Sequence, residues 1–296
     1  TAGHPEYGHL AGIETTTGPL GQGLANAVGM AIAERQLRAD YGADLVDHNT
    51  YAIVGDGCLM EGISHEAASL AGHQRLGRLI VLFDDNGISI DGPTSLSVSD
   101  DHTARFQAYG WHVESVDGHD PAAVAEAIKA AKADARPSLI RCKTTIGFGA
   151  PNKAGTSGSH GSPLGPDEIK GAREALGWTA EPFVVPDDIL SAWRASGERS
   201  VDEHAAWKTR LEASDRVMEF KAQIDGVVNV SLDARIHEIK SAMRESGKGP
   251  ATRSASQDVL KTIVDAVPWM LGGSADLTGS NNTDTKSLTP ITADNP

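Results

Sequence analysis

Four short apolar runs, separated by stretches of helix-forming residues, constrain the fold of this chain most strongly. They cover residues 51–54, 79–83, 111–116 and 138–144. Runs of this length without strict alternation are typical of strands covered on both faces, as in a parallel sheet. Helices are expected over 20–38, 59–72 and 122–135, the last with Asp120 as N-cap and Pro121 in its first turn. The alternation predicts an α/β fold with a doubly wound parallel sheet.

Composition narrows the class of protein. The chain of 296 residues is 40% hydrophobic, which suffices for one large domain or two ordinary ones. Its formal net charge of −14 disfavours attraction to nucleic-acid phosphates, so nucleic acid is not an expected partner. Two cysteines, Cys58 and Cys142, are too few for a disulfide framework and favour a reducing cytoplasm. No apolar run reaches the roughly 20 residues of a membrane span, so no membrane partner is expected.

The chain changes character after the fourth apolar run. A glycine-rich loop occupies residues 147–163, and a loop of this length is usually functional or disordered. Charged helical segments follow over 167–246 and end in Gly-Lys-Gly-Pro at 247–250. A helix over 254–267 and a short strand over 269–271 are expected next. We therefore predict a first domain over 1–166, a helical connecting region over 167–250, and the start of a second α/β domain over 251–296.

Oxygen-bearing residues follow two of the predicted strands. Gly55-Asp56-Gly57 comes after the first apolar run, and Asp85-Asn86-Gly87-Ile88 comes after the second. Because ligands bind outside the carboxyl ends of parallel strands, both segments should converge on one point. The carboxylate of Asp56, the amide oxygen of Asn86 and the backbone carbonyl of Ile88 suit magnesium. Gly57, which has no side chain, lets a phosphate approach the backbone amide. The pair predicts a magnesium and diphosphate site.

These segments have two other interpretations. Either motif alone is an ordinary turn, but their occurrence at matching strand ends favours a shared site. A calcium-binding loop over 84–91 does not fit, because Ile88 stands at its fifth position and the closing glutamate is missing.

Longer segments resemble the transketolase family. Gly55-Asp56-Gly57 and Asp85-Asn86, separated by 27 residues, resemble the thiamine diphosphate binding motif. Further segments similar to this family are 3–6, 14–23, 55–72, 84–92, 143–149, 160–161 and 272–277. The resemblance covers nearly the whole chain and is weakest over 180–250. It implies the thiamine diphosphate-binding fold, with thiamine diphosphate and Mg²⁺ as cofactors and Ca²⁺ or Mn²⁺ as possible substitutes for the metal.

The resemblance also implies roles for individual residues. The magnesium ligands would be Asp56, Asn86 and the Ile88 carbonyl. The remaining cofactor contacts fall into four groups: Gly57 and Asn86 at the diphosphate, Gly18, Pro19 and Leu20 at the aminopyrimidine ring, Ile88 and Ile146 at the thiazolium, and Asp276 near the cofactor from the second domain. His4 and His160 would contact substrate hydroxyls or the diphosphate and help to transfer protons, as imidazole can near neutral pH.

Four more residues carry roles by resemblance. Arg253 and Ser280 match sugar-phosphate contacts, for which a guanidinium is well suited. Glu61 and Glu66 match acids at a dimer interface that link two active sites. Arg253 could instead be a surface residue beside a helix start, and two glutamates on a helix are often a solvated face. The other nine of the 11 histidines are expected to be surface or structural residues.

The resemblance further implies that this chain is a piece of a longer protein. Thr1 is not methionine, Ala2 stands where the family often has proline, and 282–296 departs from the family pattern. The family's catalytic glutamate and further phosphate-binding residues would lie beyond Pro296, and another substrate histidine before Thr1. We therefore expect the piece alone to be inactive. A homodimer is implied for the full-length protein.

The implied activity is that of transketolase in the pentose phosphate pathway. This reaction moves a two-carbon ketol unit from a ketose phosphate to an aldose phosphate through a carbanion of thiamine diphosphate. Dihydroxyacetone synthase, which uses a different acceptor, is an alternative within the same chemistry. A noncatalytic cofactor-binding or interaction module is an alternative of another class.

Overall fold

A computed structural model describes residues 6–228, 231–247 and 249–296. Residues 1–204 belong to one compact unit and residues 205–295 to a second. Each unit is described by itself. The domain boundaries at 166 and 250 stay predictions, and Lys248 of the predicted Gly-Lys-Gly-Pro break lies outside the described residues.

The first unit is built on a parallel sheet, as predicted. Its strands are β1 (Thr50–Gly55), β2 (Leu79–Asp85), β5 (His112–Asp117) and β6 (Ser138–Lys143). They pair in the order β1-β2-β6-β5, with every pair parallel. The register sets Gly55 beside Asp84, so the two polar motifs leave the sheet at the same edge. Within the described residues β1 is an edge strand, and its Ile53 is 81% exposed and its Tyr51 49% exposed.

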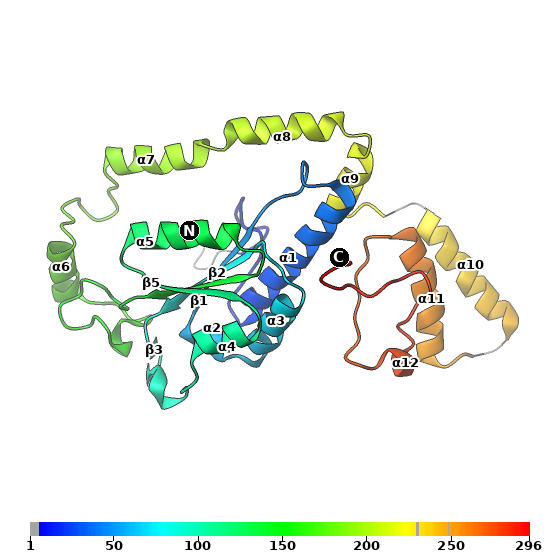
Figure 1. The fold of residues 1–296 in the computed structure, drawn as a ribbon, viewed down its shortest axis with the longest axis horizontal. Helices are drawn as coiled ribbons and strands as arrows, with labels where there is room; N and C mark the ends of the chain where they lie inside the picture. The colour runs from blue at the N-terminus through cyan, green and yellow to red at the C-terminus, as the bar shows by residue number, and fades with distance from the viewer. Residues whose placement is uncertain (1–5, 229–230, 248) are drawn as a thin grey trace. The chain divides into compact units, whose positions relative to one another are not determined.

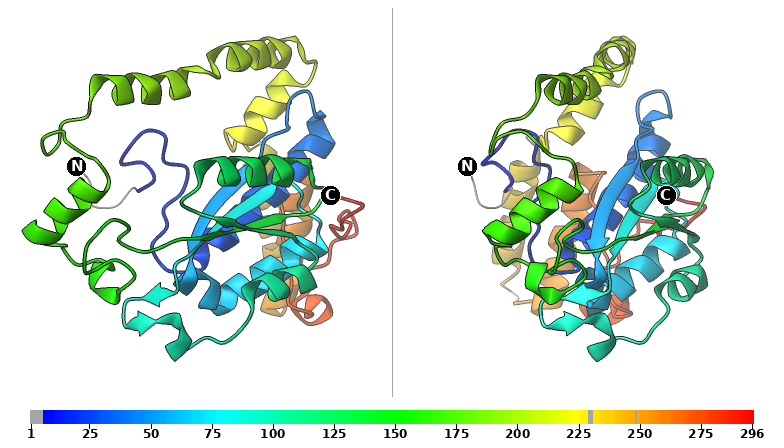
Figure 2. Two further views of the ribbon diagram at one scale, coloured as in Figure 1. Left: turned by 60° about the vertical axis from the view of Figure 1, so that its left-hand side comes forward. Right: turned by 90° about the vertical axis from the view of Figure 1, so that its left-hand side faces the viewer.

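Helices cover both faces of this sheet (Figures 1 and 2). One face packs on α1 (Gln22–Tyr41), α3 (Gly62–His73) and α4 (His102–Ala108), and the other packs on α5 (Pro121–Ala133). Alternate residues of β2 therefore enter different cores: Leu79, Val81 and Phe83 the first, Ile80 and Leu82 the second. Burial on both faces explains why the run is apolar without alternation. The doubly wound arrangement is confirmed.

The start of α5 confirms the predicted cap. The Asp120 carboxylate accepts hydrogen bonds from the backbone N–H of Ala122, at 2.9 Å, and of Ala123, at 3.2 Å. These two bonds satisfy donors that have no partner inside the helix, and Pro121 fits the first turn because it has no N–H.

The single helix predicted over 59–72 is wrong. The structure has α2 (Asp56–Met60) and α3, separated by Glu61 in an extended conformation. The break leaves carbonyl groups without helical partners, and side chains satisfy two of them. Arg105 Nη2 donates to the Leu59 carbonyl at 2.9 Å, and Ser64 Oγ donates to the Cys58 carbonyl at 2.5 Å.

Shorter elements complete the first unit. β3 (Ile88–Ser89) and β4 (Gly92–Pro93) form a small antiparallel pair directly after Asn86 and Gly87. The others are the 3-10 turns η1 (Thr94–Leu96) and η2 (Ser157–Ser159) and the helices α6 (Pro166–Ala175) and α7 (Asp187–Glu198). η2 lies inside the glycine-rich loop.

The second unit is helical. Helix α8 (Val201–Ala213) crosses the division between the units, followed by α9 (Val217–Ile224), α10 (Ser231–Ser246), α11 (Thr252–Ala266) and α12 (Thr278–Asn281). α10 packs against α11. The predicted strand over 269–271 is wrong, because these residues form a turn and irregular backbone. A strand needs a hydrogen-bonding neighbour, and the described residues of this unit provide no strand for it to pair with.

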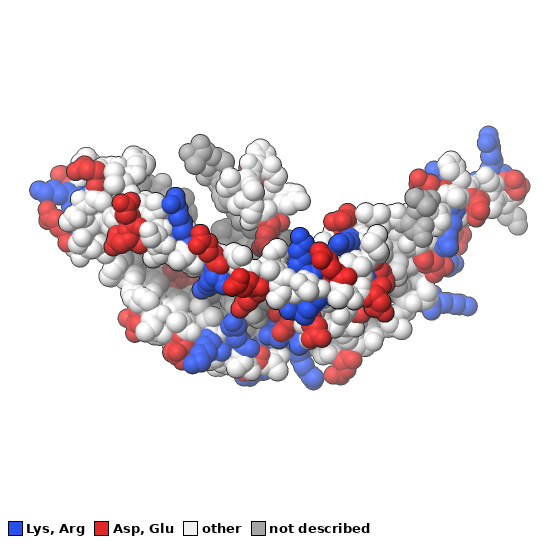
Figure 3. Space-filling model, turned by 90° about the horizontal axis from the view of Figure 1, so that it is seen from above, with Lys and Arg blue, Asp and Glu red and all other residues white. Residues whose placement is uncertain are grey.

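Charged side chains of both signs are mixed on the viewed face of the molecule. On the face drawn in Figure 3, the described Lys and Arg residues are interspersed with Asp and Glu, without a broad area of one sign. Among the helices that the structure describes, none has the length and apolar composition needed to cross a membrane.

Candidate functional site

Asp56 lies at the carboxyl end of β1, where it begins α2. Its side chain is buried, at 5% exposure, and Oδ2 accepts hydrogen bonds from the backbone N–H of Asn86 at 3.3 Å and of Gly87 at 3.1 Å. Burial raises the pKa of this carboxyl, the Gly87 N–H opposes the rise, and the nearby Asp85 adds to it. The two predicted motifs therefore meet at this carboxylate.

The segment after β2 is held in a tight turn. Asn86 Nδ2 donates to Asp84 Oδ2 at 3.2 Å, while Asn86 Oδ1 accepts from the Ile88 N–H at 3.0 Å. Gly87 has a φ of +72°, which suits glycine. Ile88 pairs with Pro93, which has no amide hydrogen to donate to the Ile88 carbonyl. The side chain of Asn86 is therefore fixed within the turn whose backbone N–H groups bond to Asp56.

Asp85, a buried acid at the end of β2, has two cationic partners and directly precedes this turn. Asp85 accepts from Arg141 Nε at 2.5 Å and lies 3.3 Å from Lys143 Nζ. Both partners come from β6, the neighbouring strand of the sheet. The charge of Asp85 is thus compensated by the protein itself. Asp56, in contrast, is held by two neutral N–H groups.

The segment predicted to line the aminopyrimidine packs close to these residues. A Cβ added at Gly57 would lie 3.1 Å from Leu20 Cδ1, which places Leu20 beside the start of α2. Gly18, Pro19 and Leu20 also line a cavity of about 380 Å³, together with residues of α1 and β1. The structure thus brings the segment 18–20 to the same end of β1 as Asp56.

The glycine-rich loop begins beside β5 and β6 and folds back on itself. The carbonyl of Ile146 accepts from the Gly155 N–H at 2.8 Å, and His160 follows η2 as an exposed residue. His119 Nε2 accepts from the Thr145 N–H at 2.9 Å, and its ring stacks on Phe148 with centroids 4.0 Å apart. The loop that carries Ile146 and His160 is therefore anchored at its start.

A second anchor holds the middle of this loop. The Glu168 carboxylate, on α6, accepts from the backbone N–H groups of Asn152 and Lys153, both at 3.1 Å, and from Asn152 Nδ2 at 2.7 Å. These hydrogen bonds lower the pKa of Glu168. Lys153 Nζ in turn donates to the carbonyls of Pro163 and Leu164. Sequence reasoning missed Glu168, because nothing in its local pattern distinguishes it from any acid in the first turn of a helix.

The predicted interface acids are both exposed. Glu61 stands at the break between α2 and α3, and Glu66 lies on α3. Ile63 and Leu70 are also exposed, and their spacing from Glu66 places all three on one face of the helix. An exposed helical face with large apolar residues beside acids is compatible with either solvent or a partner.

The second unit contains three of the predicted residues. Arg253 Nη1 donates to the Ser280 carbonyl at 3.3 Å, so these two lie together. Asp276 is exposed and has a φ of +57°, an uncommon conformation for a residue with a side chain. His4, the remaining predicted residue, lies outside the described residues.

The predicted metal site is not a cluster of metal-binding side chains. No group of three or more His, Cys, Asp or Glu side chains that could hold a metal ion occurs among the described residues. The predicted set of Asp56, Asn86 and Ile88 has a single carboxylate and is not of that type. It draws on an amide oxygen and a backbone carbonyl, which are ligands that magnesium accepts.

These features define an α/β protein in which two polar motifs meet at the carboxyl ends of β1 and β2. Residues 1–232 match the family described as "Transketolase, thiamine diphosphate binding domain". The chain is 54% identical to the transketolase of Cereibacter sphaeroides over 291 residues, which cover 98% of this chain and 44% of that protein. The chain belongs to the transketolase family and carries its thiamine diphosphate-binding domain.

Solved structures agree with this assignment. The transketolase of Leishmania mexicana superposes with a TM-score of 0.89 at 40% identity, over 100% of this chain and 45% of that one. A transketolase of Pichia stipitis, solved in complex with sedoheptulose 7-phosphate, superposes with a TM-score of 0.86 at 39% identity, over 96% and 43% of the two chains. The chain thus spans less than half the length of the relatives it matches.

Proposed function

We propose that this chain supplies the part of a transketolase that holds the cofactor diphosphate and its magnesium ion. The complete enzyme would transfer a two-carbon ketol unit from a ketose phosphate to an aldose phosphate. One observation carries the proposal: the buried Asp56 carboxylate, at the end of β1, is bonded to the backbone N–H groups of Asn86 and Gly87 after β2. Membership of the transketolase family supports the same reaction.

The donor set fits a magnesium ion. The hydrogen bonds of Asp56 use Oδ2, which leaves Oδ1 for a cation. Asn86 Oδ1 accepts one hydrogen bond and retains a second lone pair, and Ile88 faces a proline. Asp56, Asn86 and the Ile88 carbonyl would hold Mg²⁺, for which Ca²⁺ or Mn²⁺ could substitute. Because burial raises the pKa of Asp56, a divalent cation would favour its charged form.

The chain's own residues would bind and orient the cofactor. Thiamine diphosphate, when bound, supplies a stabilised carbanion for the attack on the ketose carbonyl. Gly57 and Asn86 would bind its diphosphate, and the absence of a side chain at Gly57 permits close approach to the backbone. Gly18, Pro19 and Leu20 would line the aminopyrimidine, while Ile88 and Ile146 would contact the thiazolium.

Proton transfer and sugar-phosphate binding would each use predicted residues of this chain. His160, on the anchored glycine-rich loop, and His4 would contact substrate hydroxyls and move protons between them. Arg253 and Ser280 would bind the sugar phosphate, and their contact at 3.3 Å in the second unit supports a shared role. Asp276 would lie near the cofactor. A Pichia stipitis relative is described in complex with a sugar phosphate, which supports this substrate class.

The complete protein would be a cytoplasmic homodimer. The exposed face of α3, with Ile63, Glu66 and Leu70, supports this proposal because it presents apolar side chains beside an acid. Glu61, at the start of the same helix, would lie in the same interface.

Calorimetry of thiamine diphosphate binding, with and without Mg²⁺, tests the proposal. Asp56→Ala should abolish the magnesium-dependent part of the affinity, since it removes the charged ligand. Glu174→Ala, which removes an exposed acid on α6, is the control and should bind as the unchanged protein does. Unchanged affinity in Asp56→Ala would show that the cradle is wrongly assigned. With the complete enzyme, comparison of ribose 5-phosphate and formaldehyde as acceptors separates transketolase from dihydroxyacetone synthase.

A further inference from the structure

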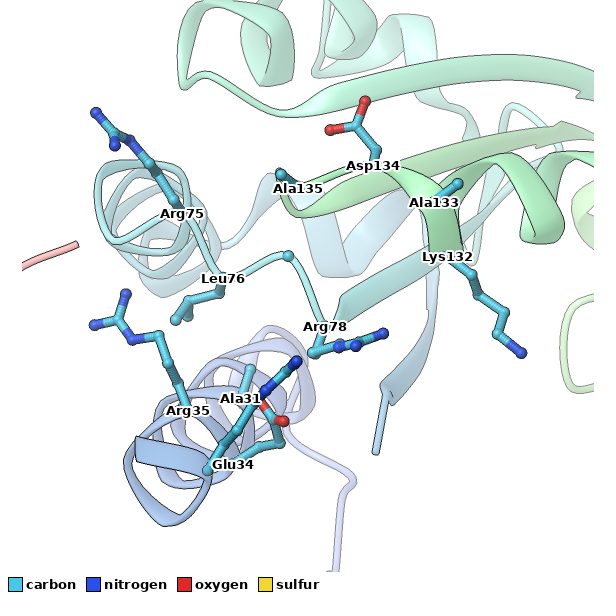
Figure 4. A pocket seen from close by; sticks show the side chains of 12 residues that line it. Ala31, Glu34, Arg35, Arg75, Leu76, Arg78, Lys132, Ala133, Asp134 and Ala135 are labelled. Atoms are coloured by element: carbon cyan, nitrogen blue, oxygen red, sulfur yellow. The ribbon is translucent and has the colours of Figure 1, made fainter. Parts of the chain in front are cut away.

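A second cavity lies at the opposite end of the sheet from Asp56 (Figure 4). It has a volume of about 350 Å³ and is bounded by the last turns of α1, the residues before β2, and the end of α5. Strand β2 spans seven residues between the two ends. At about 3.3 Å per residue, the cavity is roughly 20 Å from the diphosphate cradle. A ligand there would not touch the cofactor.

Cationic side chains dominate the lining of this cavity. They are Arg35, Arg38, Arg75, Arg78 and Lys132, against the acids Glu34 and Asp134. The negative charge of Asp134 is already compensated by Arg136, which donates hydrogen bonds to this carboxylate from Nε at 3.0 Å and from Nη2 at 2.8 Å. Asp47, just outside the lining, is shared by Arg38, at 2.9 Å, and Arg78. The charged side chains of the lining are therefore positive in sum, and the negative ends of α1, α3 and α5 offset part of that charge.

Lys132 and Glu34 are the lining residues whose charged groups could bond directly to a ligand. Lys132 is exposed at the end of α5 and forms no ion pair or hydrogen bond with any residue that the structure describes. Glu34, on α1, is 2% exposed, yet its Oε1 has no hydrogen-bond partner in the described structure. Figure 4 shows Glu34 between α1 and the segment that carries Arg78. A buried oxygen without a partner costs free energy. Because this oxygen has almost no exposed surface, a ligand hydroxyl would recover that free energy after rotation of the Glu34 side chain toward the cavity.

Helix dipoles offer a simpler explanation for part of this cluster. α1, α3 and α5 all end near the cavity, and basic residues in a last turn stabilise a helix C-terminus. That effect accounts for Arg38 and Lys132. It accounts neither for the open volume between the helices nor for the unpartnered oxygen of Glu34.

We propose that this cavity binds a small phosphate-bearing polyol, separately from the cofactor. The phosphate would lie against Lys132, with Arg38 and Arg78 beside it, because cationic donors form strong hydrogen bonds with phosphate oxygens. A hydroxyl of the same ligand would bond to Glu34 Oε1. The site therefore favours a phosphorylated polyol over inorganic phosphate, and both over an uncharged polyol.

Calorimetry of the whole chain with glycerol 3-phosphate, inorganic phosphate and glycerol tests this site. Glycerol 3-phosphate has no carbonyl group and is therefore not a ketol donor or acceptor. It should bind most tightly, inorganic phosphate more weakly and glycerol not measurably. Added salt should weaken the binding of both anions. Absence of binding by glycerol 3-phosphate at millimolar concentration would overturn the proposal.

Variants separate this site from general attraction of anions. Lys132→Gln should weaken glycerol 3-phosphate binding about tenfold. Lys170→Gln, which removes an exposed lysine of α6, should leave it unchanged. Glu34→Leu should remove the preference for glycerol 3-phosphate over phosphate. Equal losses in both lysine variants would overturn the proposal. The proposal would also be overturned if Lys132→Gln melted at a lower temperature but bound glycerol 3-phosphate as before. Loss of stability without loss of binding is expected when Lys132 only compensates the helix dipole.

Discussion

Gly21 offers a quantitative test of how the segment before α1 is packed. Its φ is +82°, and a conformation of this kind costs a residue with a side chain about 1–2 kcal/mol. An added Cβ would lie 2.7 Å from Glu61 Cβ and 2.8 Å from Ile63 Cγ2. Overpacking typically costs a further 1–3 kcal/mol or so. Gly21→Ala should therefore lower the free energy of unfolding by about 2–5 kcal/mol.

Two other glycines separate these contributions. Gly110 has a φ of +86° with no atom within 4 Å of an added Cβ, so Gly110→Ala measures backbone strain alone. Gly29, inside α1, is equally open and has no positive φ. Gly29→Ala should stabilise the chain by up to about 1 kcal/mol through helix propensity.

Urea unfolding followed by circular dichroism gives the three changes in stability. Calorimetry with thiamine diphosphate and Mg²⁺ then reports the effect on the site. Gly21→Ala should also weaken cofactor binding, because movement of Gly21 displaces the adjoining segment 18–20. Gly110→Ala should bind normally at temperatures where it is folded. If Gly21→Ala lost no more stability than Gly110→Ala, the close packing of Gly21 against Glu61 and α3 would be refuted.

Two further predictions concern groups away from the cradle. Glu168→Ala should loosen the glycine-rich loop, which would be measured as faster amide hydrogen exchange over 147–163. Asp167→Ala, which changes the neighbouring acid on α6, should leave the exchange unchanged. Equal exchange in both variants would argue against the contact of Glu168 with the loop. Arg136, donating hydrogen bonds, lowers the pKa of Asp134 from 3.8 to about 2, so this carboxylate stabilises the fold above pH 3.8 and loses that contribution as the pH falls toward 2. Asp134→Asn should melt at a lower temperature than the unchanged chain at pH 5, with the difference shrinking toward pH 2; a constant difference would contradict the assignment.

The sheet and the meeting of the two motifs could be predicted because both follow from strand direction. Apolar runs located the strands, and parallel strands place their carboxyl ends at one edge, so Asp56 and Asn86 had to lie near each other. The N-cap at Asp120 was equally predictable, since it depends on neighbouring residues only.

Features that depend on distant packing could not be predicted in this way. The break at Glu61 is stabilised by Arg105, far along the chain, and by Gly21 packing against it. The contact of Glu168 with the glycine-rich loop depends on where α6 is placed. The prediction of a strand over 269–271 was wrong because it considered local residues only. The apolar residues of this segment suit a strand, but strand formation requires a neighbour that local sequence does not reveal.

The position of β1 at the edge of the sheet has a consequence for ligand affinity. This strand leads directly into Asp56, yet it forms its ladder with β2 alone among the described strands. A strand supported on one side opens more readily than a central one, and each opening separates Asp56 from the N–H groups of Asn86 and Gly87. The measured dissociation constant equals the intrinsic one divided by the closed fraction. With the cofactor at the proposed Asp56 site, a partner that paired with the outer edge of β1 would tighten cofactor binding without touching the cofactor.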